Sequence, residues 1–122
     1  MAKILIVEDD EDLNKAYSLI LKREKHSVNS VFDGQQALDK LKRFQPDLIL
    51  LDLLMPIKSG LDFLREYTKR RKEENAKVVI FTNLENSPEI IEAFDLGAYK
   101  CIVKSWTAPQ GLAKVVNDVL RA

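Results

Sequence analysis

Five side chains in this sequence carry groups that could take part in one reaction. Glu8 and Asp9 are neighbouring acids, Asp52 is a third, and Thr82 and Lys104 supply a hydroxyl and an ammonium. Three clustered carboxylates repel one another unless their pKa values rise or a cation joins them. A hard divalent ion with oxygen ligands, Mg²⁺ or Mn²⁺, suits such a cluster and often accompanies phosphoryl groups. A carboxylate can act as the nucleophile and form an acyl phosphate, while the ammonium and hydroxyl stabilise the transferred group.

Each of these residues is a weak signal alone, and their positions after predicted strands give them weight. Short apolar runs predict strands buried on both faces, as in a parallel sheet. The expected strands are Lys3–Val7, Val28–Phe32, Asp47–Leu51, Lys77–Phe81 and Tyr99–Val103. The acids Glu8 and Asp9 follow the first of these, Asp52 the third, Thr82 the fourth and Lys104 the fifth.

Between the strands, apolar residues recur at helical spacing and predict five helices. They are Leu13, Ala16, Tyr17, Ile20 and Leu21; Ala37, Leu38, Leu41 and Phe44; Leu61, Leu64 and Tyr67; Ile90, Ile91 and Phe94; and Leu112, Val115, Val116, Val119 and Leu120. Asp33 precedes the second helix, Ser87-Pro88 is typical of the start of the fourth, and Gly97 is placed to end it. This alternation predicts a doubly wound α/β fold, whose sites lie beyond the carboxyl ends of the strands.

The composition limits the possible partners and location. The 122 residues fit one domain, residues 1–122, and 19 basic residues balance 19 acidic ones. We therefore expect no binding of nucleic acid or of a membrane surface by this domain. The single cysteine, and the lack of a leader or an apolar run long enough to span a bilayer, predict a cytoplasmic protein.

Taken together, these motifs resemble the receiver domain of two-component response regulators, similar to a single-domain chemotaxis receiver. The resemblance spans the chain through ILIVEDD, DGQQAL, PDLILLDLLMP, VVIFT, LGA and IVK. It implies a flavodoxin-like, five-stranded sheet of order 2-1-3-4-5 with five helices. It also implies a phosphorelay role, with a histidine kinase or phosphotransfer protein as donor and an output partner that the sequence does not name.

The resemblance assigns roles to the reactive residues. It implies that Asp52 accepts the phosphoryl group, assisted by Thr82 and Lys104. A magnesium site is implied at the carboxylates of Glu8, Asp9 and Asp52 and at the backbone carbonyl of Leu54, with Glu8 expected to act through water. The domain would then promote its own phosphorylation and dephosphorylation and would not be an enzyme with a separate substrate.

Several positions depart from the family pattern. Ser105 replaces the usual proline after the lysine, Cys101 replaces the switch aromatic, and Asn83 replaces a small residue. We expect a trans Lys104–Ser105 peptide bond, since a cis bond before a non-proline residue is costly, and a weakened switch at Cys101. Leu54 and Leu84 flank the expected path of hydrolytic water and cannot bind it, which predicts a long-lived phosphorylated form.

Two alternatives have different requirements. A pseudo-receiver would keep the fold and signal without phosphate. The departures at Asn83, Cys101 and Ser105 leave this alternative open, but it would not need an uncompensated acid cluster. A Mg²⁺-dependent aspartyl phosphatase would need a second acid two residues after Asp52, where Leu54 stands.

His26 is expected in a loop far from the site, and Trp106 is expected to cover the fifth helix. The five phenylalanines are expected in the core.

Overall fold

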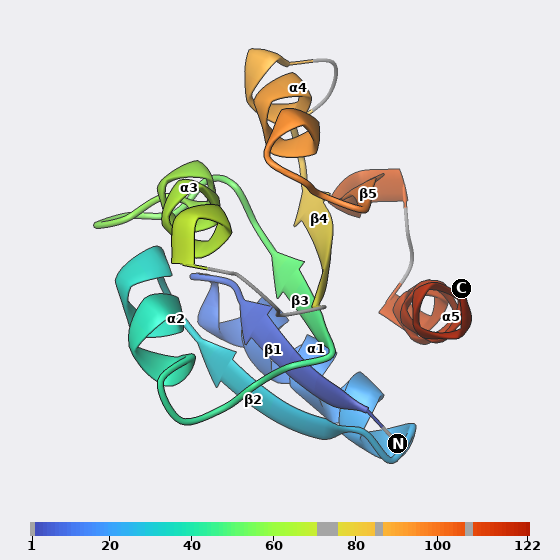
Figure 1. Cartoon of the computed structure of the whole chain (residues 1–122). Coiled ribbons are helices and arrows are strands. Elements are labelled where there is room, and N and C mark those ends of the chain that lie inside the picture. The colour runs from blue at the N-terminus through green and yellow to red at the C-terminus, as the bar shows by residue number, and fades with distance from the viewer. Residues whose placement is uncertain (1, 71–75, 85–86, 107–108) are drawn as a thin grey trace.

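A five-stranded parallel sheet forms the centre of the computed structural model, in the order β2-β1-β3-β4-β5 (Figure 1). The structure describes residues 2–70, 76–84, 87–106 and 109–122. The elements are β1 (Lys3–Val7), α1 (Glu11–Arg23), β2 (Ser27–Val31), α2 (Gly34–Lys40), β3 (Leu48–Leu51), α3 (Gly60–Arg70), β4 (Lys77–Thr82), α4 (Pro88–Asp95), β5 (Lys100–Val103), a 3-10 turn (Lys104–Trp106) and α5 (Pro109–Arg121). Fold class and strand order are as predicted, and every predicted strand bound lies within one residue of the observed one.

Helices cover both faces of the sheet, because alternate side chains of each central strand point to opposite faces. Leu5 and Val7 of β1 belong to a core that also contains Ala37, Leu38, Phe63, Leu64 and Ala93 from α2, α3 and α4. Ile4 and Ile6 belong to a second core with Tyr17, Leu21, Leu112 and Val116 from α1 and α5. The apolar runs of the central strands are therefore buried on both sides.

Polar caps fix where the helices begin. The Asp33 side chain accepts a hydrogen bond from the Gln36 amide at 2.8 Å, and the Ser87 hydroxyl accepts one from the Ile90 amide at 3.4 Å. Each satisfies an amide that lacks a partner in the first helical turn. Gly97, with φ of +106°, follows α4 in a conformation that favours glycine. The predicted caps and the predicted stop are confirmed.

Three sequence expectations need correction. The second helix ends at Lys40, and Phe44 lies beyond it, because the chain continues in tighter turns in which the Lys42 and Arg43 amides donate to the carbonyls of Asp39 and Lys40. Phe32 and Phe94 are 40% and 46% exposed, outside the core that holds Phe63 and Phe81. Phe32 follows the edge strand β2, which is paired on one side only, and α4 turns Ala93 rather than Phe94 toward the sheet.

Among the residues that the structure describes, no helix has both the length and the apolar character needed to cross a membrane.

Candidate functional site

Three carboxylates converge at the carboxyl edge of the sheet. β1 and β3 pair in register, with Val7 opposite Leu51, so the next residues, Glu8 and Asp52, emerge beside each other. Each of Glu8, Asp9 and Asp52 offers an oxygen, and these oxygens lie within 4.8 Å of one another. Glu8 and Asp52 are buried, whereas Asp9 is exposed. The arrangement concentrates negative charge where a cation can reach it from solvent.

Lys104 brings the compensating charge from the far strand of the sheet. Its ammonium donates to Glu8 Oε1 and, at 2.8 Å, to Asp52 Oδ2. The three side chains are between 4% and 10% exposed, so solvent screens these ion pairs less than surface pairs. Removing one partner would leave a buried charge uncompensated, which is strongly destabilising.

Burial and pairing act in opposition on the pKa values of this group. Burial raises the pKa of Glu8 above its ordinary value, and the hydrogen bonds from Lys104 and the Asp10 amide only partly offset that rise. Burial by itself lowers the pKa of Lys104. The hydrogen bonds to Asp52 and Glu8, together with their negative charges, outweigh this effect, so the pKa lies above its ordinary value. The ammonium therefore stays charged and serves as the local counter-ion.

The other oxygen of Asp52 and the Thr82 hydroxyl have weaker partners. The Leu54 amide donates to Asp52 Oδ1 at 3.3 Å, while the Leu54 side chain is 55% exposed. Thr82 is fully buried at the end of β4, and its hydroxyl accepts from the Leu84 amide at 3.4 Å. The structure thus brings Glu8, Asp9, Asp52 and Lys104 together, with Thr82 at the next strand end and bonded to its own loop.

A buried asparagine that sequence reasoning missed holds the first loop in place. Both amide hydrogens of Asn14 are used: Nδ2 donates to the carbonyl oxygens of Glu8 and Val31, each at 2.9 Å. It thereby ties the ends of β1 and β2 to α1 and fixes the backbone of Glu8. The available signal was a polar residue between Leu13 and Tyr17 on the inward face of an amphipathic helix.

The donor set fits a magnesium ion. Opposite ligands of Mg²⁺ are about 4.2 Å apart, because Mg–oxygen distances are about 2.1 Å. The oxygens of Glu8, Asp9 and Asp52 lie within 4.8 Å of one another, so small side-chain adjustments bring them to distances that suit an ion. Glu8 Oε1 already accepts from Lys104 and Oε2 from the Asp10 amide at 3.0 Å. Contact between Glu8 and an ion through a water is therefore easier to accommodate than direct ligation.

The departures from the family pattern lie around Lys104. No cis peptide bond occurs among the described residues, so the bond between Lys104 and Ser105 is trans, as predicted. Cys101 is partly buried against the core on the α2–α4 face, and burial raises the pKa of its thiol. The expectation that Trp106 covers α5 falls on a side chain outside the described part of the chain.

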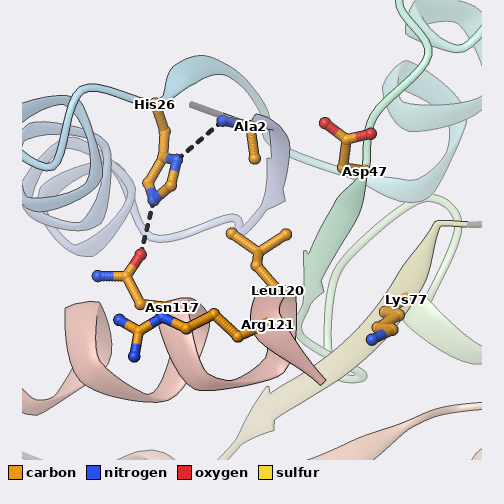
Figure 2. A pocket seen from close by; sticks show the side chains of 7 residues that line it. All are labelled: Ala2, His26, Asp47, Lys77, Asn117, Leu120 and Arg121. Atoms are coloured by element: carbon orange, nitrogen blue, oxygen red, sulfur yellow. Dashed lines mark hydrogen bonds between the residues drawn. The ribbon is translucent and has the colours of Figure 1, made fainter.

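A separate cleft of about 510 Å³ opens at the opposite, amino edge of the sheet, where Figure 2 shows His26 between Ala2 and Asn117. His26 Nδ1 accepts from the Ala2 amide at 3.2 Å, so Nε2 carries the hydrogen and donates to Asn117 Oδ1 at 2.8 Å. Both ring nitrogens are engaged in holding the chain start against α5. The predicted loop position of His26 is confirmed, and it lies away from Asp52.

Comparison with known proteins agrees with this geometry. The family model described as "Response regulator receiver domain" matches residues 4–117. The response regulator ArlR of Staphylococcus aureus is 35% identical over 115 residues, which cover 94% of this chain and 51% of ArlR. This chain thus spans about half the length of the curated relatives it matches.

Solved structures show the same arrangement of elements. The BeF3-activated N-terminal receiver domain of RstA from Klebsiella pneumoniae has a TM-score of 0.84 and 28% identity, covering 98% of this chain and 99% of that one. A CheY-like receiver domain protein from Methanospirillum hungatei has a TM-score of 0.90, with coverage of 99% and 94%. At 24% identity, that second likeness concerns the fold alone.

Proposed function

Because the chain belongs to the response regulator receiver family of two-component systems, we propose that it accepts a phosphoryl group on Asp52 from a histidine kinase or phosphotransfer protein. One observation carries this proposal. The Asp52 carboxylate accepts a hydrogen bond from the Lys104 ammonium and lies within 4.8 Å of the Glu8 and Asp9 oxygens, a set suited to a divalent ion. A nucleophile is thereby placed beside the positive charge that phosphoryl transfer requires.

The reaction is a displacement at phosphorus. A carboxylate oxygen of Asp52 attacks the phosphorus of the donor's phosphohistidine and forms an O–P bond. The N–P bond breaks, and its electron pair returns to the imidazole nitrogen of the donor. The product is an acyl phosphate on Asp52, which a water molecule later cleaves to inorganic phosphate and the free carboxylate.

Glu8, Asp9, Asp52 and the Leu54 carbonyl would hold Mg²⁺, with Glu8 acting through a water. When bound, the ion supplies positive charge beside the phosphoryl oxygens. The protein residues orient the group and replace its hydration. Asp9 is the exposed member of the three acids, so a cation can reach it first.

Lys104 and Thr82 act on the oxygens of the transferred group. Lys104 already contacts Asp52, so a small displacement of its flexible side chain moves the ammonium from the carboxylate to a phosphoryl oxygen. Thr82 holds its hydroxyl at the neighbouring strand end, where the weak contact with the Leu84 amide is easily exchanged for a phosphoryl oxygen. That exchange would displace the loop after β4. The surface formed by this loop would then differ between the two phosphorylation states, and an output partner could distinguish them.

The alternatives lack support at the residues they need. A phosphatase with a separate substrate needs an acid two positions after Asp52, and the aliphatic Leu54 cannot protonate a leaving group. The domain therefore acts only on its own phosphorylation state. A pseudo-receiver has no physical reason to retain a buried carboxylate pair bridged by a lysine, because replacing buried ion pairs with apolar residues is often neutral or stabilising.

Labelling with acetyl phosphate tests the proposal without a cognate kinase. The wild-type chain should incorporate phosphate with Mg²⁺ and lose this activity with a chelator. Asp52→Asn should abolish incorporation, whereas Asp39→Asn, a surface acid on α2, should leave it unchanged. Equal labelling of Asp52→Asn and the wild type would contradict the assignment.

A further inference from the structure

The two loops that follow β4 and β5 are joined by a hydrogen bond between two residues that depart from the family pattern. The Ser105 amide donates to Asn83 Oδ1 at 3.1 Å. Asn83 directly follows Thr82, and Ser105 directly follows Lys104. β4 and β5 pair up to Thr82 opposite Val103, so this bond continues the connection between the strands beyond their last paired residues.

Each partner requires the other for this bond to exist. A proline at position 105 would have no amide hydrogen to donate. An alanine or glycine at position 83 would have no side-chain oxygen to accept it. The two replacements that the sequence presents separately, Asn83 and Ser105, thus form one donor–acceptor pair in the fold.

Lys104 is the residue with most need of such a restraint. β5 is an edge strand, and the Lys104 ammonium must reach Asp52 after β3 and Glu8 after β1, across the intervening β4. The backbone at Lys104 has already left the strand and begun a short 3-10 turn. Position 105 has no proline to stiffen the chain, and the Asn83 side chain supplies a hydrogen bond that ties this turn to the end of β4.

We infer that Asn83 is a positioning residue for phosphoryl transfer. It accepts a hydrogen bond from the Ser105 amide and so holds Lys104 where its ammonium reaches Asp52. This inference rests on the proposed function, since it assigns Asn83 a part in the same reaction. The hydrogen bond of the Asn83 side chain is to the Ser105 amide, so we assign it a role in positioning Lys104 and not a role in the transfer step.

The expected effect follows from the strength of one exposed neutral hydrogen bond. Its removal lowers the population of the competent loop conformation, and the rate falls by the same factor, roughly two- to tenfold. Asn83→Ala should slow labelling by acetyl phosphate by that factor, at saturating Mg²⁺. If Asn83 instead obstructs access to Asp52, the same substitution should accelerate labelling, which would overturn the inference.

Two backgrounds at position 105 separate the hydrogen bond from other roles of the asparagine. Ser105→Ala keeps the amide hydrogen, so adding Asn83→Ala should again slow labelling by roughly two- to tenfold. Ser105→Pro removes that hydrogen, so adding Asn83→Ala should have no further effect. Equal effects of Asn83→Ala in both backgrounds would overturn the inference.

Hydrogen exchange of the Ser105 amide tests the hydrogen bond directly. This measurement depends neither on the labelling reaction nor on the folding of the Ser105→Pro variant. The Ser105 amide should exchange with solvent more slowly in the wild type than in Asn83→Ala, and unchanged exchange would refute the bond. The wild-type labelling rate separates the two claims. A wild-type chain that takes no phosphate overturns the proposed function, whereas a labelled wild type matched in rate by Asn83→Ala overturns only the positioning role.

Discussion

Gly60 is the first residue of α3, and its backbone packs closely against Asp52, the proposed site of phosphorylation. A Cβ added at Gly60 would lie 2.2 Å from the carbonyl oxygen of Asp52 and 2.6 Å from Leu53 Cα. Ordinary contact begins at about 3.5 Å, so Gly60→Ala must displace the loop by about 1 Å. The Gly60 amide also donates to the Leu53 carbonyl at 3.0 Å, and that displacement strains this bond.

The magnitude follows from these two contacts. Overpacking typically costs about 1–3 kcal/mol, and weakening one backbone hydrogen bond adds about 1 kcal/mol. Gly60→Ala should therefore lower the free energy of unfolding by about 2–4 kcal/mol. A displacement of this size next to Asp52 should also slow labelling by acetyl phosphate about 100-fold.

Gly97→Ala is the matched control. Gly97 has φ of +106° but nothing within 4 Å of an added Cβ, and it lies at the end of α4 away from Asp52. Its replacement should cost about 1–2 kcal/mol from backbone strain alone and leave the labelling rate unchanged. Both variants make the unfolded chain less flexible to the same degree, so this contribution cancels when they are compared.

Urea denaturation in the presence of a chelator, followed by far-UV circular dichroism, measures the stability of both variants. Labelling at temperatures where both are folded measures the site. If Gly60→Ala were no less stable than Gly97→Ala and labelled at the wild-type rate, the close packing of α3 against Asp52 would be wrong.

Three further predictions concern metal binding, backbone strain and phosphate lifetime. Asp9→Asn should weaken Mg²⁺ binding about tenfold or more, measured by isothermal titration, because it removes a carboxylate ligand; wild-type affinity would exclude Asp9 from the site. Ile57 is 86% exposed with φ of +66°, so Ile57→Asn should stabilise the fold by about 1 kcal/mol in thermal unfolding, and a lower melting temperature would contradict this. Leu54→Asn combined with Leu84→Glu should speed loss of the phosphoryl group by supplying polar guides for water, whereas unchanged decay would show that the leucines do not control lifetime.

The sequence predicted the sheet well because its central strands are buried on both faces. The apolar runs at Lys3–Val7 and Leu48–Leu51 have few alternatives to a buried parallel strand, and parallel pairing then carries Glu8 and Asp52 to one edge. Caps such as Asp33 and Ser87 act within a few residues and were equally readable.

Contacts between distant loops could not be read in the same way. The Asn83–Ser105 bond and the Lys104 ion pairs join residues far apart in sequence, and no local pattern reports them. Side chains at the margins were also misjudged. Phe32 and Phe94 are exposed because an edge strand and an outer helical face leave them uncovered, which depends on the packing of whole elements.

The most direct test of the account is the location of the phosphoryl group. The chain would be treated with acetyl phosphate and Mg²⁺, the acyl phosphate reduced with borohydride, and the modified position identified by peptide mass spectrometry. The account predicts one modified residue, Asp52, and loss of the modification when the chelator replaces Mg²⁺. Modification of another residue with Asp52 intact would contradict it.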